Sequence, residues 1–138
     1  MELTLFKTII EAIQGVVGIA NELSQADDRK RERVAAWLQQ LGELIQDIAD
    51  NLELNDYPHN TCAQMEIMVD HFPLIVDDLI EEEKLKTITE MLKSCTQIEQ
   101  LFGEMSTLKK KERDKMIVQL LHASGKLQGL ASIIKHMD

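Results

Sequence analysis

Aromatic residues, proline and glycine are all scarce in this sequence, and each scarcity excludes a class of protein. Phe, Trp and Tyr together make up 4% of the 138 residues, which is too few for a β-sandwich core or for stacking on nucleic-acid bases. Two prolines and six glycines cannot supply the many turns that an all-β chain requires. The composition therefore argues against a β protein.

Cysteine and long apolar runs are scarce as well. Cys62 and Cys95, the two cysteines, are not spaced as metal ligands or as a redox pair. The uncharged stretch from Ala12 to Asn21 is far shorter than the ~20 apolar residues of a membrane span. No secretory signal peptide is recognisable at the start. We expect a cytoplasmic protein with reduced thiols and no integral membrane span.

Basic residues are outnumbered by acidic ones. The chain has 15 Lys and Arg against 24 Asp and Glu, for a net charge of −9. A protein that binds nucleic acid usually presents enough basic groups to neutralise several phosphates, so we expect no nucleic-acid partner. Apolar residues make up 44% and charged residues 28%, as in a globular protein.

Apolar residues recur at three- and four-residue steps, which is the spacing of an α-helix. Five segments follow this pattern, at about 4–23, 27–52, 61–80, 84–102 and 109–136. Turn-forming residues concentrate in a loop at 55–60, and we expect a tight reversal at 81–83. The fold class that follows is all-α, an antiparallel up-down bundle of four to five helices in a single domain, 1–138.

Several local expectations accompany this fold. Pro73 predicts a kink or break at Phe72, because proline lacks an amide proton and crowds the preceding turn. Asp27 or Ser24 is suited to cap the second segment. The start of the third segment at Thr61 fits a capping box, and Gly103 is placed to follow the fourth. The second segment's stripe, with Trp37, Leu41, Leu44 and Ile48, is expected to face the first segment.

Basic residues gather at the start of the last segment. The cluster consists of Lys109, Lys110, Lys111, Arg113 and Lys115, and lysines at a helix N-terminus oppose the helix dipole. The sharper interpretation is contact with phosphate groups or an anionic membrane. The simpler one is a solvated face. An acidic turn at 77–83 is expected to lie near the basic run 29–33 and to neutralise it.

His122 invites a comparison with histidine phosphotransfer domains. The run Leu121-His122-Ala123-Ser124-Gly125-Lys126, followed by Gly129, resembles the helix that carries the phosphorylated histidine in those four-helix bundles. The family usually places Lys three residues and Gly four residues after the histidine, whereas here the order is inverted. The alternative is a half-exposed histidine on an amphipathic helix.

Other candidate chemistry is weaker. A di-metal bundle needs histidines that follow a glutamate by three positions, and none of the four histidines, His59, His71, His122 and His136, does so. Cys62 lies at a helix start, where the dipole lowers the thiol pKa, while Cys95 falls on an apolar stripe. The seven methionines are either core residues or the lining of a groove for a partner helix. We therefore expect no enzyme, no metal and no cofactor.

Two further resemblances are matters of pattern. An apolar first helix from Met1, followed at once by a longer amphipathic helix, resembles the HeLo-type and mixed-lineage-kinase-like N-terminal four-helix modules of cell-death effectors. That resemblance implies membrane engagement by the first helices and a separate regulatory domain. The run Tyr57-Pro58-His59-Asn60-Thr61-Cys62-Ala63-Gln64-Met65-Glu66 resembles cyanobacterial helical-bundle proteins that look like adaptor modules of signalling or defence proteins.

The function predicted from these observations is a non-enzymatic protein–protein interaction bundle of the adaptor or signalling type, with protein partners. The first alternative is a membrane-engaging helical module, and the second is a histidine phosphotransfer-like protein. The sequence leaves a homodimer open.

Overall fold

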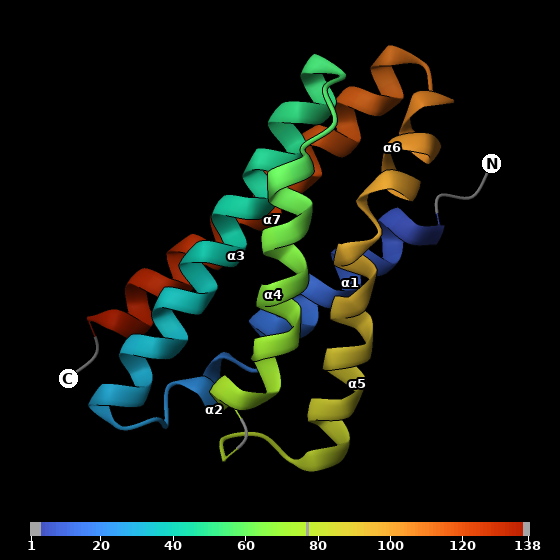
Figure 1. Ribbon diagram of the computed structural model, residues 1–138. Coiled ribbons are helices and arrows are strands. Elements are labelled where there is room, and N and C mark those ends of the chain that lie inside the picture. Colours follow the sequence, from blue (N-terminus) through green and yellow to red (C-terminus); the bar gives the residue numbers. More distant parts are fainter. Residues whose placement is uncertain (1–3, 77, 137–138) are drawn as a thin grey trace.

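The computed structural model describes residues 4–76 and 78–136, and every regular element within them is a helix (Figure 1). The all-α class is thus confirmed. The elements in chain order are α1 (Thr4–Gly18), α2 (Ala20–Leu23), α3 (Asp28–Leu54), α4 (His59–Val76), α5 (Glu82–Leu92), the 3₁₀ helix η1 (Lys93–Thr96), α6 (Ile98–Ser106) and α7 (Lys110–Lys135).

The long helices alternate in direction. In Figure 1, α3 rises, α4 descends, α5 and α6 rise together as one broken rod, and α7 descends beside α3. The pair α3 and α7 forms the most extensive helix–helix contact in the described part of the chain. Helix α1 lies between α7 on one side and α5 and η1 on the other. The α3–α7 pair therefore forms one side of the molecule, and α5, η1 and α6 form the other. Helices α1 and α4 contact both sides.

Two expected segments are interrupted. The first is divided after Gly18, where Ile19 leaves the helical backbone before α2. The fourth is divided into α5, η1 and α6, and Gln97, with φ −95° and ψ 50°, separates the last two. Helix α6 continues past Gly103 to Ser106, and in its last turn the Ser106 and Thr107 hydroxyls donate to the Gly103 and Glu104 carbonyls. Gly103 therefore does not follow a helix end.

The helix ends agree in part with expectation. Asp27 caps α3 by accepting a hydrogen bond from the amide of Lys30 at 2.9 Å, as predicted. At the other end Asn55 takes the left-handed conformation, with φ 56°. Helix α4 begins at His59 rather than at Thr61, and the Thr61 hydroxyl donates to the Asp47 carboxylate on α3 instead of capping the helix.

Pro73 does not break α4 at Phe72. The helix runs through Pro73 and ends three residues later at Val76, so the helix end lies within one turn of the proline. The reversal into α5 precedes Glu81, the residue at the cap position. It therefore lies earlier than the expected 81–83. Asp77 lies outside the described residues.

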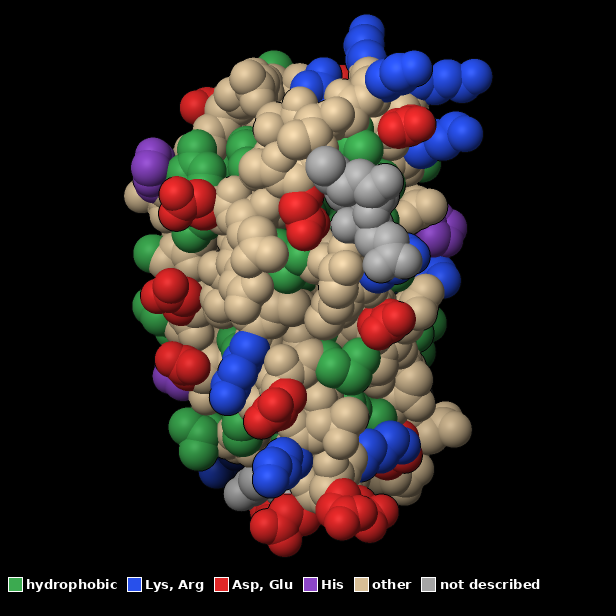
Figure 2. Space-filling model, turned by 90° about the vertical axis from the view of Figure 1, so that its right-hand side faces the viewer, with side chains coloured by type: hydrophobic (Ala, Val, Ile, Leu, Met, Phe, Trp, Pro, Cys, Tyr) green, Lys and Arg blue, Asp and Glu red, His purple; other side chains and the backbone are tan. Residues whose placement is uncertain are grey.

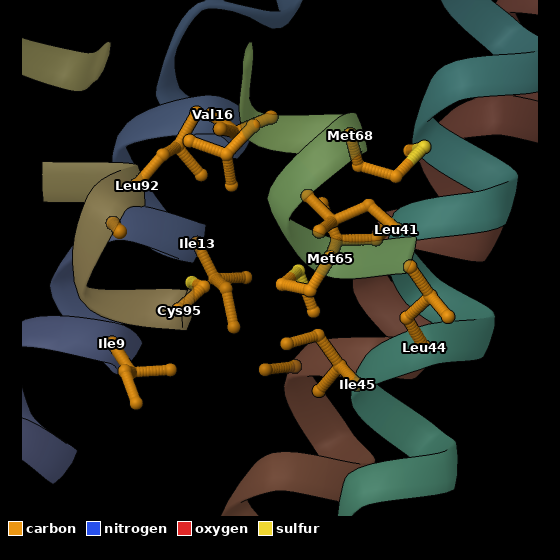
Figure 3. Packing of buried hydrophobic residues seen from close by; sticks show 14 of the residues in the cluster. Ile9, Ile13, Val16, Leu41, Leu44, Ile45, Met65, Met68, Leu92 and Cys95 are labelled. Atoms are coloured by element: carbon orange, nitrogen blue, oxygen red, sulfur yellow. The ribbon is translucent and has the colours of Figure 1, made fainter. Parts of the chain in front are cut away.

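The core is continuous through the bundle (Figure 3). Side chains from α1, α3, α4, α5 and η1 converge there, among them Ile9, Ile13, Leu41, Ile45, Met65, Leu92 and Cys95. Cys95 and the buried methionines Met65, Met68 and Met105 are core residues. Trp37 is buried but faces α4 rather than the first helix, since its indole N–H donates to the Met68 carbonyl at 2.8 Å and its ring lies 4.9 Å from that of Phe72.

The acidic turn and the basic run meet at one end of the bundle. The Lys30 ammonium lies 3.5 Å from an Asp78 carboxylate oxygen, which joins the start of α3 to the turn after α4. A second ion pair, Lys84 with Glu22 at 3.0 Å, holds α5 to α2. Both pairs are partly solvated, so neither contributes much to stability.

Candidate functional site

A groove of about 640 Å³ lies between α1 and α7. Its lining is mostly apolar or small, with polar groups at the rim. The lining residues are Ile10, Ile13, Gln14, Val17 and Gly18 from α1, and Val118, Gln119, His122, Ala123 and Lys126 from α7. Concave, largely apolar sites with a few polar groups are the usual form of a ligand or partner site.

The groove depends on how α7 packs against α3. Ser124 faces Gly42, and its hydroxyl donates to the Gly42 carbonyl at 2.6 Å. Gln128, one turn later, bonds both Gln39 at 3.1 Å and Gln46 at 3.2 Å. These contacts fix the rotation of α7 about its own axis. Val118 and His122 are therefore turned away from α3, towards the groove and the solvent.

Solvent-facing positions of α7 form a face with few charges. This outer face of α7 consists of Val118, Leu121, His122, Gly125, Gly129 and Ile133. Val118 is 62% exposed and Ile133 64% exposed. A Cβ at Gly125 or Gly129 would meet no atom within 4 Å. Exposed glycine costs about 1 kcal/mol against alanine in a helix, and nothing inside the described part of the molecule requires it there.

His122 lies where the groove meets the outer face of α7. Its side chain is exposed and makes no hydrogen bond or ion pair with any residue that the structure describes. Lys126 follows it by one helical turn and lines the same groove. The structure thus brings the predicted His122 and Lys126 together, with Gly125 and Gly129 leaving space on the solvent side.

The predicted basic cluster lies at the start of α7. Lys109, at the cap position, makes no side-chain capping bond, and it is exposed together with Lys110, Lys111 and Lys115. Arg113 is half-buried, and its Nε has no hydrogen-bond partner within residues 4–76 and 78–136. Basic side chains project from the upper end of the molecule in Figure 2. Lys115 precedes His122 by seven residues, ~10 Å along the helix.

Met1, from which the apolar first segment starts, lies outside the described residues. The first helix itself is not available at the surface as a whole, because Leu5, Phe6, Ile9, Ala12, Ile13 and Val16 are buried in the core. Among the described helices, none is both long and apolar enough to cross a membrane.

The two cysteines are in different surroundings. The Cys62 thiol lies 3.4 Å from the Tyr57 hydroxyl, and this hydrogen bond, helped by burial, raises the pKa of Tyr57 to about 12. Burial raises the pKa of Cys95 to about 12 as well. Tyr57 and Cys95 therefore stay protonated at neutral pH, and neither is activated as a nucleophile. Within the described residues, no three His, Cys, Asp or Glu side chains are grouped as metal ligands.

Sequence reasoning missed the groove itself. Val118, which lines the groove, is an apolar residue outside the core stripe of the last segment, and such a residue indicates an exposed apolar surface. The contribution of Ile10 and Val17 had no such signal, since both also fit the apolar stripe of the first segment.

Comparisons of the chain with protein-family models, with curated proteins and with solved structures find no match.

Proposed function

We propose that this chain is a non-enzymatic protein–protein interaction module that receives a partner helix in the α1–α7 groove and on the adjoining outer face of α7. The scaffold of this proposal is an antiparallel up-down bundle. The observation that carries the proposal is the exposure of Val118, which lines the apolar groove, and of its neighbour Leu121 on the outer face of α7, at 62% and 37%. Large exposed apolar side chains that adjoin one another mark interaction surfaces.

The chemistry of the groove defines the partner. Lys126 and His122 are the ionisable side chains among the lining residues, and none of the lining residues is acidic. An amphipathic helix would place its apolar stripe on Ile10, Val17 and Val118 and a carboxylate near Lys126. Gly125 and Gly129 allow the backbone of that helix to come close to α7.

A selection from displayed amphipathic helical peptides tests the proposal. We expect the enriched peptides to carry a carboxylate beside the apolar stripe. Val118→Lys/Ile133→Lys should weaken their binding by about tenfold or more, since a lysine at each position opposes burial of the apolar stripe.

Ile67→Lys on α4 is the matched control, because Ile67 is 58% exposed but lies away from the groove. Its binding should equal that of the wild type. Enriched peptides that bind the double variant as well as the wild type would exclude the groove, as would a selection without enrichment.

Phosphotransfer at His122 is a second candidate function, favoured by its exposure and by Lys126 one turn away. An imidazole nitrogen would attack the phosphorus of a partner's acyl phosphate, the P–O bond to the carboxyl group would break, and the carboxylate would leave. Lys126 would balance phosphoryl charge. Incubation with phosphoramidate should add one acid-labile phosphoryl group, lost in His122→Gln and kept in His71→Gln, which removes another exposed histidine. Equal labelling of both variants would exclude this role.

Membrane engagement is the third candidate, supported by the exposed lysines of the basic cluster. With most of the apolar residues of α1 buried, contact would rest mainly on charge and would be weak and sensitive to salt.

A further inference from the structure

A second hollow, of about 730 Å³, lies between the start of α3 and the end of α7. It is at the opposite end of α7 from the basic cluster and outside the proposed groove. Its floor is built from small side chains, Ala35, Ala36 and Ala131. Ala35 precedes Gly42 by seven residues and Ala131 follows Ser124 by seven, so the hollow continues the row of small residues along which α3 and α7 pack.

The rim of this hollow is basic. Arg29, Arg33 and Lys135 line it together with His136, and Glu32 is the one carboxylate among the lining residues. Three permanent positive charges against one negative charge are unusual on a chain whose net charge is −9. The positive end of the α3 dipole and the negative end of the α7 dipole lie side by side here and largely cancel. Side chains therefore determine the potential in the hollow.

The neighbouring basic residues at the start of α3 have ion-pair partners, whereas the two arginines of the hollow have none among the described residues. Lys30 pairs with Asp78 and Arg31 with Asp28. Arg29 and Arg33 have no hydrogen bond or ion pair with a described residue, although both stand in the first turns of a helix, where the dipole favours acidic side chains. The negative end of the α7 dipole favours a lysine at position 135. The dipole of α3 has the opposite sign at Arg29 and Arg33 and does not favour arginine there.

We propose that this hollow binds a small soluble phosphate monoester, with the phosphate held by Arg29 and Arg33 and an apolar group lying on the alanine floor. Arginines four residues apart lie on one side of a helix, and their guanidinium groups suit the oxygens of a dianionic phosphate. Lys135 supplies the third charge from α7. The floor is too apolar to hold a bare anion by hydrogen bonds, and it suits the ester group.

Titration of the ¹⁵N-labelled protein with phenyl phosphate, inorganic phosphate and phenol tests this assignment by NMR. Phenyl phosphate should shift the amides of residues 29–36 and 131–135 along one binding curve. Inorganic phosphate should bind the same residues about threefold or more weakly, because it lacks the ring. Phenol alone should shift none of them.

Two double variants distinguish binding in the hollow from a general effect of the protein's net charge. Arg29→Gln/Arg33→Gln should weaken phenyl phosphate binding by about fivefold or more, whereas Lys109→Gln/Lys110→Gln, which removes the same charge at the other end of α7, should leave it within about twofold. The wild-type shifts locate the site even if a variant folds poorly. Equal losses in both variants, shifts centred on 109–115, or no shift with phenyl phosphate would each overturn the proposal.

Discussion

The Ser124 hydroxyl and the Gly42 carbonyl oxygen lie 2.6 Å apart, in a buried hydrogen bond between α7 and α3. The contact brings two helix backbones close together at one point. A Cβ on Gly42 would lie 2.7 Å from Gln128 Cγ and 3.1 Å from the Ser124 carbonyl oxygen. The second of these neighbours is backbone, which can move only with its helix.

We predict that Gly42→Ala destabilises the protein by about 1–3 kcal/mol, although alanine is the better helix former, because the methyl group forces α3 and α7 apart. Urea unfolding followed by circular dichroism measures the change. Gly129→Ala is the matched control: its Cβ meets no atom within 4 Å, so it should stabilise by up to about 1 kcal/mol. A Gly42→Ala protein at least as stable as the wild type would contradict the close approach.

Leu41 is fully buried, with 0% of its surface exposed, whereas Leu54 is 75% exposed. We predict that Leu41→Ala lowers the free energy of unfolding by about 2–5 kcal/mol, and that Leu54→Ala changes it by less than ~0.5 kcal/mol. Both variants delete the same atoms, so the difference between their free energies of unfolding in urea measures the effect of burial. Similar effects from both would show that the inward face of α3 is assigned incorrectly.

Ionisation of Cys95 should make the free energy of unfolding fall as the pH becomes alkaline. Burial raises its pKa from an ordinary 9.0 to about 12. Above pH 9 the unfolded chain therefore loses the thiol proton while the folded chain keeps it. The stability from the protonated thiol is complete below pH 9 and falls as pH rises towards 12, by at most about 1.4 kcal/mol per pH unit.

Urea unfolding between these pH values checks the Cys95 prediction. Cys95→Ala should show a shallower fall in stability with pH than the wild type. Cys62→Ala keeps the buried thiol and should retain the steeper fall between pH 9 and 10, below the range in which the raised pKa of Tyr57 contributes. Equal slopes in the wild type and Cys95→Ala would mean that this thiol ionises freely in the folded protein.

The basic cluster gives a prediction for anionic lipid. We expect weak binding of the wild type to phosphatidylserine vesicles at low salt, at ~1 kcal/mol per basic residue near the surface, and its loss near physiological salt. Changing Lys109, Lys110 and Lys111 to Glu should abolish binding. Changing Lys86, Lys93 and Lys126 to Glu alters net charge equally and should reduce binding less. No wild-type co-sedimentation at low salt, or equal binding by both variants, would rule out the membrane role.

Periodicity alone predicted much of the fold. The helices, the Asp27 cap and the loop after Leu54 all follow from residues near one another in sequence. The meeting of Lys30 with the acidic turn was expected from the antiparallel order of the helices. An apolar stripe shows which side of a helix is buried, but it does not show which other helix that side contacts. Trp37 was correctly placed inward, but its partner on α4 depends on three-dimensional packing.

The rest of the fold and site depended on contacts between distant residues. The break at Gln97 and the continuation of α6 through Gly103 have no strong local signal, because helix propensities are weak compared with packing. The candidate site needed α1 and α7 side by side. His122 and Lys126 could be singled out from sequence, but the groove next to them could not.

The hydrogen bond from Ser124 to Gly42 spans 82 residues of sequence. The most extensive helix contact of the molecule therefore joins one of its earliest long helices to its last. Forming it requires closure of a long loop that contains α4, α5 and α6, and the entropy of that closure must be met before the contact contributes. Helical bundles rich in local contacts fold quickly. This chain should fold more slowly than such bundles, and a chain growing from its N-terminus would expose Ala35 and Gly42 until α7 had been made.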